Sequence, residues 1–312
     1  MKPRVLQAGR FLPPTEAILA AEFDLHPLWR EADTAAFLAK HGGEFVGLAT
    51  TGMVGADAAL MAALPSLKVI ASRGVGFDKV DLDAAKRQGI VVSNTPGVLT
   101  DCVADLAFTM VLTAARNICT ADRFVRRGDW QRGRFPMSTR VSGKRLGILG
   151  LGRIGRTVAK RASGFDMEIR YYDVQKIADV PYVYEPSLVE LARWTDFLVI
   201  TAAGGPSTRH MVSAEVIAAL GPDGFLINAA RGTIVDQAAL VDALVNKRLA
   251  GAGLDVFEDE PNVPAALVEL DNVVLLPHVA SSTNETFKAM EDLVLENLRS
   301  YFRAGKLVTP IF

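Results

Sequence analysis

Short apolar runs alternate with stretches of helical spacing along two parts of the chain, one ending at residue 98 and one starting at residue 144. The runs have the length and composition of buried strands. In the first part the predicted strands are 3–9, 46–49, 68–71 and 90–92. In the second part they are 145–149, 167–172, 197–201, 225–229, 251–254 and 273–276. This alternation predicts an α/β fold, in which parallel sheets carry helices on both faces.

Two long helices are predicted outside this alternation. The stretch 100–127 is apolar nearly all round as far as residue 115, so we expect one long helix that is buried on most sides. Thr100 is its candidate N-cap. The stretch 285–303 is amphipathic, and we expect it to return to the first part of the chain. The domains predicted on this basis are 1–98 with 283–312, and 99–282.

Composition and charge exclude several classes of protein. Half of the 312 residues are hydrophobic and 22% are charged, which is enough to bury substantial cores. The net charge of −1, without a basic stripe, argues against a nucleic-acid surface. Because there is no run of 18 apolar residues and no signal-like N-terminal stretch, we expect a cytoplasmic protein that has no membrane partner.

The two cysteines, Cys102 and Cys119, indicate neither a disulfide nor a metal site. On one straight helix they would lie about 25 Å apart, which is too far to bridge. Neither cysteine lies at a metal-ligand spacing from other candidate ligands, so no metal is expected.

A glycine motif follows the predicted strand 145–149. Gly150, Gly152 and Gly155 form a G-x-G-x-x-G that leads into a predicted helix. In this context Gly150 permits a tight turn, Gly152 lets the backbone approach a pyrophosphate, and Gly155 lets helix and strand pack closely. The diphosphate would bind N–H groups at the positive end of the helix. Strand, turn and helix together predict a dinucleotide site.

An acidic residue, Asp173, ends the next predicted strand, 18 residues after Gly155. Its carboxylate would accept hydrogen bonds from the adenosine ribose hydroxyls and would repel a 2′-phosphate, so Asp173 favours NAD. Arg170 and Lys176 are near enough in sequence to offer a phosphate some positive charge, which leaves NADP open.

Three reactive side chains, Arg231, Glu260 and His278, follow three successive predicted strands of the second part. The carboxyl ends of parallel strands meet at the edge of the sheet where ligands bind. Arg231 offers a planar, charged fork for the carboxylate and the ketone of a 2-oxo acid. His278 can donate a proton near neutral pH, and Glu260 would orient its ring and favour the imidazolium. This set predicts the reduction of a ketone.

The first part of the chain offers candidate substrate contacts. Gly74, Val75 and Gly76 follow a predicted strand, and their backbone N–H groups can form a nest for a carboxylate. Thr51 and Met53, after another strand, could line the far end of the same cleft.

The remaining histidines and an aromatic segment show no pattern of chemistry. His26, His41 and His210 lack a partner pattern, so we interpret them as structural. Core or interface packing is expected for three large side chains that could otherwise reach a neighbouring subunit's cleft. These side chains are Trp130, Phe135 and Met137.

The chain resembles the D-isomer-specific 2-hydroxyacid dehydrogenases over nearly its whole length. The segments that carry the resemblance are ASRGVGFDKVDL, SNTPGVLTDCVADLAF, GKRLGILGLGRIG, LINAARGTIVDQAAL, GAGLDVFEDEP and NVVLLPHVASST. The last four, in this order and spacing, are highly specific. Within the family the chain is most similar to the branch of hydroxypyruvate/glyoxylate and hydroxyphenylpyruvate reductases.

The resemblance implies two doubly wound parallel-sheet domains with a cleft between them. One is a flavodoxin-like substrate-binding domain, and the other is a Rossmann NAD-binding domain. It also implies that the chain reduces a small 2-oxo acid to the D-2-hydroxy acid by hydride transfer from NAD(P)H. Members of the family are homodimers, joined through the cofactor domains and the long helix after residue 100.

The same resemblance implies roles for individual residues. Arg231 would bind the substrate, His278 would be the general acid and Glu260 its partner. Val75 and Gly76 would contact the substrate carboxylate. The implied cofactor contacts are Thr100, Arg153, Ile154, Ala229, Arg231, Asp255, His278 and Ala280.

Two segments depart from the family pattern. Reductases of this branch that prefer NADPH usually have a Ser/Thr/Asn-Arg segment where this chain has residues 172–175, Tyr-Asp-Val-Gln. Many relatives have Cys-Pro-Leu-Thr where this chain has residues 203–206, Ala-Gly-Gly-Pro, so the loop over the adenosine is expected to differ.

The sequence leaves the substrate open. Aromatic 2-oxo acids and 2-ketogluconate are alternatives to hydroxypyruvate and glyoxylate. A non-enzymatic alternative is a dimeric co-repressor that senses the dinucleotide. Such a sensor would need no Arg–Glu–His set, so the presence of the set argues against it.

Overall fold

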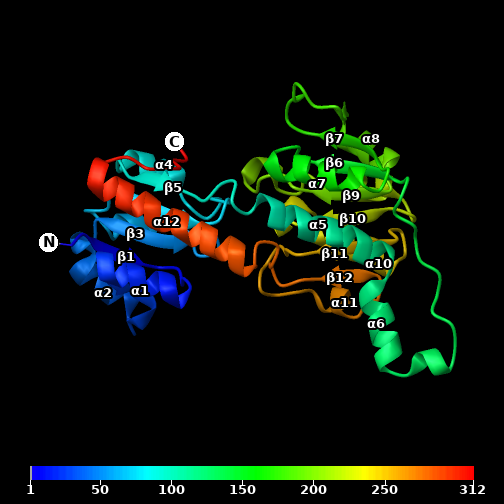
Figure 1. Cartoon of the computed structure of the whole chain (residues 1–312), viewed down its shortest axis with the longest axis horizontal. Coiled ribbons are helices and arrows are strands. Elements are labelled where there is room, and N and C mark those ends of the chain that lie inside the picture. Colours follow the sequence, from blue (N-terminus) through cyan, green and yellow to red (C-terminus); the bar gives the residue numbers. More distant parts are fainter. Residues whose placement is uncertain (1) are drawn as a thin grey trace. The chain divides into compact units, whose positions relative to one another are not determined.

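A computed structural model describes residues 2–312, which divide into two compact units. Unit 1 comprises the residues up to Leu99 together with Ser281–Phe312, and unit 2 comprises Thr100–Ala280. Each unit has its own parallel sheet (Figure 1).

The sheet of unit 1 has five parallel strands in the order β2-β1-β3-β4-β5. Their bounds are β1 (Arg4–Gln7), β2 (Asp24–Pro27), β3 (Gly47–Thr51), β4 (Val69–Arg73) and β5 (Val91–Ser93). This is the flavodoxin-like order, with its switch point between β1 and β3. The pattern of the sequence did not predict β2, because this edge strand is short, largely accessible and ends in proline.

Helices cover both faces of the unit 1 sheet. They are α1 (Pro13–Glu22), α2 (Thr34–His41), α3 (Ala58–Ala62), α4 (Leu82–Arg87) and α12 (Asn284–Ala304). Aspartates cap three of them: the side chains of Asp33, Asp57 and Asp81 each accept a backbone N–H of the first turn. The long helix α12 packs against β4 and α1, which gives the unit its second core layer.

The sheet of unit 2 has seven parallel strands in the order β12-β11-β10-β9-β6-β7-β8. Their bounds are β6 (Arg145–Leu149), β7 (Glu168–Tyr172), β8 (Val183–Tyr184), β9 (Phe197–Ile200), β10 (Phe225–Asn228), β11 (Gly251–Leu254) and β12 (Val273–Leu275). The order is that of a Rossmann fold, with an extra strand and a switch point between β6 and β9. The sequence pattern missed β8, which has only two residues.

Two separate cores lie on the two faces of the unit 2 sheet. One contains side chains of α5 (Thr100–Ala115) and α7 (Arg153–Ser163). The other contains side chains of α8 (Leu188–Trp194), α9 (Ala214–Leu220), α10 (Gln237–Val245) and α11 (Ala265–Val268). Both units are therefore doubly wound, and the predicted α/β class with two parallel sheets is confirmed.

The prediction of a single helix over 100–127 is wrong. The structure has α5, which ends at Ala115, and α6 (Ile118–Arg126), with a 60° bend between them. Asn117 lies between them in the left-handed region, with φ of 50°, a conformation that asparagine tolerates better than most residues. The estimated separation of the two cysteines assumed a straight helix and fails with it. Among residues 2–312, no single helix is long and apolar enough to cross a membrane, although α5 and α6 would pass that test together.

Candidate active site

The loop between β6 and α7 has a shape that requires glycine. Gly150 has φ of 92°, in the left-handed region. A Cβ atom at residue 155 would lie 2.2 Å from the Gly150 carbonyl oxygen, so only glycine fits there. A Cβ at Gly152 would meet no atom within 4 Å, which leaves open space directly over the backbone. The loop thus combines a tight local fold with an accessible backbone.

The space over Gly152 fits the diphosphate of a dinucleotide. Arg153 and Ile154 lie in the first turn of α7, where backbone N–H groups have no acceptor within the helix. These N–H groups and the positive end of the helix dipole favour an anion. The loop therefore presents free N–H groups beside open space, as a bound diphosphate requires.

The carboxylate of Asp173 is tied to the same loop. It accepts the backbone N–H of Leu151 at 2.9 Å and that of Val174 at 2.8 Å. A carboxylate can accept about four hydrogen bonds, so both oxygens keep capacity for ribose hydroxyls. Arg170 is engaged elsewhere, because its guanidinium lies 4.3 Å from the Trp194 ring centroid.

Asn228 shapes the loop that carries Arg231, and the sequence analysis missed it. Asn228 ends β10 and is 1% exposed. Its amide donates to the Arg231 carbonyl at 2.9 Å, and its side-chain oxygen accepts the Ala230 N–H at 3.0 Å. Ala229, a predicted cofactor contact, lies within the turn that these bonds close. A polar residue at the end of an apolar strand was the available signal.

Gly204 packs against the aliphatic stem of Arg231. A Cβ atom at residue 204 would lie 2.5 Å from Cγ of Arg231. The departure from the family pattern at 203–206 therefore has a local consequence, since a residue with a side chain here would displace Arg231.

The side chains of His278 and Glu260 are brought together at the carboxyl edge of the sheet. Nδ1 of His278 lies 2.7 Å from Oε2 of Glu260, and the other carboxylate oxygen accepts the Phe257 N–H at 3.1 Å. The two side chains are 27% and 18% exposed. Burial opposes ionisation of Glu260, but the hydrogen bond and the charge of His278 outweigh it and lower the pKa of Glu260.

Asp255 holds the segment that carries His278. The Asp255 carboxylate is fully buried and accepts the N–H groups of Val279 at 2.7 Å and Ala280 at 2.9 Å. Its carbonyl accepts the His278 N–H at 2.8 Å. Burial raises the pKa of Asp255 despite these two N–H donors. His278 has φ of 55°, and the bonds from Asp255 on both sides of it support this left-handed conformation.

In unit 1, side chains hold the loop 74–76 in place. Gly74 has φ of 118°, and its N–H donates to Oγ1 of Thr95 at 2.9 Å. The Asn94 amide donates to the Val75 carbonyl at 2.8 Å. Thr51 is buried at the end of β3. Nothing in the sequence spacing of Asn94 and Thr95 points to residues 74–76.

The three histidines that were interpreted as structural each lie against a carboxylate. The pairs are His26 with Glu31 at 2.9 Å, His41 with Glu44 at 2.8 Å and His210 with Glu258 at 2.7 Å. Thr100, the remaining predicted cofactor contact, is the first residue of α5.

Comparisons with known proteins identify the family of the chain. The family model described as "D-isomer specific 2-hydroxyacid dehydrogenase, NAD binding domain" matches residues 108–280. The hydroxyphenylpyruvate reductase of Plectranthus scutellarioides is 49% identical over 95% of each chain. The glyoxylate/hydroxypyruvate reductase A of Arabidopsis thaliana is 46% identical over 94% of each chain.

A solved structure of the same family has this fold throughout. It is the NADPH-dependent glyoxylate/hydroxypyruvate reductase of Sinorhizobium meliloti in complex with NADP and malonate, which is 43% identical. The match covers 100% of this chain and 97% of that one, with a TM-score of 0.94. The chain belongs to the D-isomer-specific 2-hydroxyacid dehydrogenase family and is an NAD(P)-dependent oxidoreductase.

Proposed function

We propose that the enzyme reduces hydroxypyruvate or glyoxylate to the 2-hydroxy acid, in the D configuration where that carbon is chiral, and that it favours NADH. The observation that carries the proposal is the hydrogen bond of 2.7 Å between His278 and Glu260, on the sheet edge that also carries Arg231. Two relatives that are named glyoxylate/hydroxypyruvate reductases support this substrate class.

His278 would act as the general acid through Nε2. Its Nδ1 is occupied by the hydrogen bond to Glu260, so Nε2 is the nitrogen that can face a ketone oxygen. Glu260 carries a lowered pKa and stays ionised near neutral pH, which favours the protonated ring that reduction needs. When bound, the nicotinamide supplies the hydride.

The substrate and the cofactor would be held by the predicted residues. Arg231 would bind the carboxylate and the ketone oxygen with its charged fork. The N–H groups of Val75 and Gly76 would bind the carboxylate, and Thr51 would line the pocket around the substrate. The predicted cofactor contacts are Thr100, Gly150, Gly152, Arg153, Ile154, Gly155, Asp173, Ala229, Asp255 and Ala280, with Arg231 and His278.

The preference for NADH rests on Asp173. Its carboxylate is fixed beside the glycine loop by two backbone N–H groups, so a 2′-phosphate would meet a negative charge that cannot turn away. The engagement of Arg170 with Trp194 removes one cation that could have offset this charge. Lys176 is exposed and keeps NADPH as the alternative.

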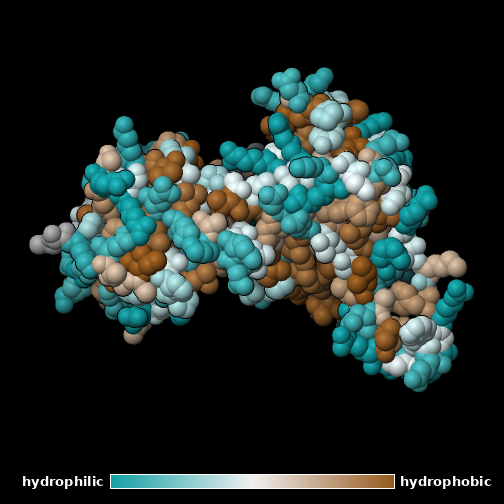
Figure 2. All heavy atoms as spheres, in the orientation of Figure 1, coloured by the Kyte–Doolittle hydropathy of each residue, from teal (hydrophilic) through white to brown (hydrophobic). Residues whose placement is uncertain are grey.

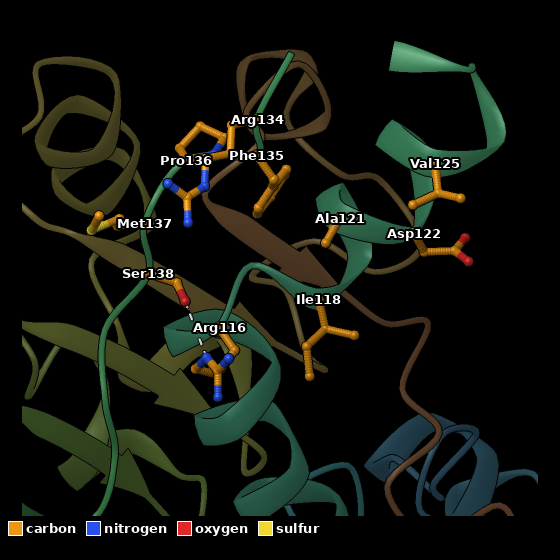
Figure 3. A pocket seen from close by; sticks show the side chains of 10 residues that line it. All are labelled: Arg116, Ile118, Ala121, Asp122, Val125, Arg134, Phe135, Pro136, Met137 and Ser138. Atoms are coloured by element: carbon orange, nitrogen blue, oxygen red, sulfur yellow. Dashed lines mark hydrogen bonds between the residues drawn. The ribbon is translucent and has the colours of Figure 1, made fainter. Parts of the chain in front are cut away.

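A homodimer is proposed for unit 2 from its exposed apolar side chains. Ile118, Val125, Trp130 and Met137 are 49%, 56%, 70% and 93% exposed. Figure 2 shows a few hydrophobic residues among hydrophilic ones where α6 projects from unit 2. The cavity between α6 and residues 134–138 has a volume of about 820 Å³ (Figure 3). A second copy of this chain is the expected occupant, since the resemblance implies dimers joined through this domain. Trp130 and Met137 are therefore not core residues.

The first experiment measures oxidation of NADH and NADPH with hydroxypyruvate, glyoxylate, phenylpyruvate and 2-ketogluconate, on protein whose mass is known from light scattering. We expect turnover with hydroxypyruvate or glyoxylate, a preference for NADH and a dimeric mass. His278→Gln should lose about 100-fold or more of kcat, because a general acid contributes on this scale, while NADH still binds.

Each proposal has its own contrary outcome. A preference for NADPH would overturn the argument from Asp173 but leave the reaction intact. Faster turnover of phenylpyruvate or 2-ketogluconate would select one of the alternative substrates. NADH binding without turnover of any acid would favour the dinucleotide-sensing co-repressor, and unchanged kcat in His278→Gln would remove His278 as the acid.

A further inference from the structure

A buried asparagine stands on the apolar side of α12. Asn297 is fully buried among hydrophobic residues of the helix, where a polar group is costly unless its hydrogen bonds are made. Its amide donates to the Leu293 carbonyl at 2.8 Å and to Oγ1 of Thr309 at 2.9 Å. Its oxygen accepts the N–H groups of Val308 and Thr309, both at 3.0 Å. All four of its bonds are made, and three of them hold the C-terminal tail, residues 308–311.

The tail in turn lies against the end of β5. Pro310 forms an antiparallel bridge with Ser93, and the Ile311 N–H donates to the Val92 carbonyl at 2.8 Å. The Thr309 hydroxyl donates to the Asn94 carbonyl at 2.6 Å. Because this hydroxyl also accepts from Asn297, its single proton is directed at Asn94.

Asn94 passes this constraint to the loop 74–76. Its side-chain amide donates to the Val75 carbonyl at 2.8 Å, and Asn94 is buried while Val75 is half-buried. The peptide bond between Val75 and Gly76 is planar, so fixing the Val75 carbonyl also fixes the direction of the Gly76 N–H on the opposite side. That N–H is one of the two donors assigned to the substrate carboxylate.

We propose that Thr309 and Asn297 are positioning residues for substrate binding, acting through Asn94 on the Gly76 N–H. The proposal rests on the proposed function, because it assigns the loop 74–76 to the carboxylate of a 2-oxo acid. It gives the fully buried side chain of Asn297 a role in α12. It also gives the C-terminal tail a function beyond covering the edge of the sheet.

The test compares Thr309→Val, which removes the hydroxyl at constant shape, with Thr309→Ser, which keeps it. Thr309→Val should raise the KM for hydroxypyruvate about three- to tenfold, the scale of one neutral hydrogen bond. The affinity for NADH should stay unchanged, since its predicted contacts lie in unit 2. Thr309→Ser should restore the KM. If the tail serves only stability, Thr309→Val should lower Tm without raising the KM for hydroxypyruvate selectively over the affinity for NADH.

A second variant tests the route through Asn94. Asn94→Ala should raise the same KM, and the double variant with Thr309→Val should be no worse than Asn94→Ala alone, because both break one chain of bonds. Full additivity of the two effects would overturn the route. Hydrogen exchange gives an independent readout, since the amide of Gly76 should exchange faster in Thr309→Val than in Thr309→Ser.

The outcomes separate this inference from the proposed function. If the wild type turns over hydroxypyruvate and Thr309→Val leaves both the KM and the Gly76 exchange unchanged, the inference is wrong and the function stands. If the wild type turns over no 2-oxo acid, the proposed function fails and the carboxylate role of the tail fails with it.

Discussion

Two loops of this enzyme contain glycines after a strand, yet they are held in different ways. In unit 2 the glycine motif 150–155 runs from the end of β6 into the first turn of α7. Its glycines are required by a contact within the motif, the close approach of Gly155 to the Gly150 carbonyl, and its side-chain partners, Asp173 and Thr201, directly follow the two neighbouring strands. In unit 1 the loop 74–76 follows β4 and is held by side chains of Asn94 and Thr95, which follow β5.

The anchors behind the unit 1 loop are more distant still. Arg73, directly before the loop, pairs with the fully buried Glu291 of α12, and Asn94 is fixed by Thr309 of the tail. A motif whose glycines are required by contacts between its own residues can be recognised in a sequence. A loop that is held by residues more than 200 positions away cannot be recognised in this way. The difference also predicts which substitutions disturb the cofactor and which disturb the substrate.

The largest effect is expected from Gly155→Ala in the locally encoded loop. The added methyl group would lie 2.2 Å from the Gly150 carbonyl, so the loop and α7 must separate. We expect the affinity for NADH to fall about 100-fold, equivalent to about 2.7 kcal/mol, measured by NADH fluorescence.

Gly152→Ala is the matched control for this loop. Its methyl group meets no protein atom within 4 Å, so Tm should be unchanged. It does enter the space proposed for the diphosphate, so NADH binding should still weaken. If Gly155→Ala binds NADH as the wild type does, or if Gly152→Ala unfolds the protein, the description of this loop is wrong.

The second effect concerns the distant anchor of the other loop. Glu291 accepts the Leu12 N–H at 3.0 Å and pairs with Arg73, whose guanidinium lies 4.5 Å from the Phe287 ring centroid. Glu291→Gln removes the charge and leaves Arg73 partly buried without it. Because glutamine can still accept a hydrogen bond from Arg73, we expect unit 1 to lose about 2 kcal/mol of stability, measured by hydrogen exchange in β4 and α12. The KM for the 2-oxo acid should rise while NADH affinity stays constant.

Glu22→Gln is the control, because Glu22 at the end of α1 pairs with the same helix, α12. Glu22 pairs with Arg299 of α12, and both side chains are well exposed, so its loss should cost less than about 1 kcal/mol. Equal losses in the two variants would mean that burial does not set the strength of the Arg73–Glu291 pair.

The same distinction explains what the sequence could predict. The strands and the turn at Gly150 follow from apolar runs and from steric limits within a few residues, and both sheets were predicted from them. The break at Asn117 was missed because α5 and α6 are both good helical sequences and only one residue departs. The edge strand β2 was missed because nothing in its own hydrophobic pattern indicates that it pairs with β1.

The candidate site contains residues of two kinds, those that the sequence indicates and those whose role appears only in the folded chain. Arg231, Glu260 and His278 could be selected because parallel strands bring their carboxyl ends to one edge, whatever lies between them. For Asn228 the sequence offered only its place as a polar residue at the end of an apolar strand, and for Asn94 it offered no signal, since each acts through a backbone group whose position only the folded chain defines. Their roles depend on geometry rather than on residue type.

The smallest effect is expected from Glu260→Gln. This variant tests the contact between Glu260 and His278, which lie 18 positions apart in the sequence. Glutamine can still accept from Nδ1 of His278, so the ring keeps its orientation, but the negative charge is lost. The lowered pKa of Glu260 means that the wild-type charge is present at neutral pH and is lost only as the pH falls through that lowered value.

Glu260→Gln should lower kcat/KM about tenfold near neutral pH, the equivalent of about 1.4 kcal/mol, because the negative charge that favours the protonated ring is gone. In a pH profile of kcat/KM, this difference from the wild type should disappear as the pH falls through the lowered pKa of Glu260, where the wild-type carboxylate is neutral as well. Glu258→Gln is the control, because Glu258 lies in the same loop but contacts His210 and Arg209 instead. An equal fall in both variants would assign the effect to the general charge of the loop. A fall in Glu260→Gln alone would show that a direct contact with His278 supports the acid, which is the property that separates this pair from the anchors of unit 1.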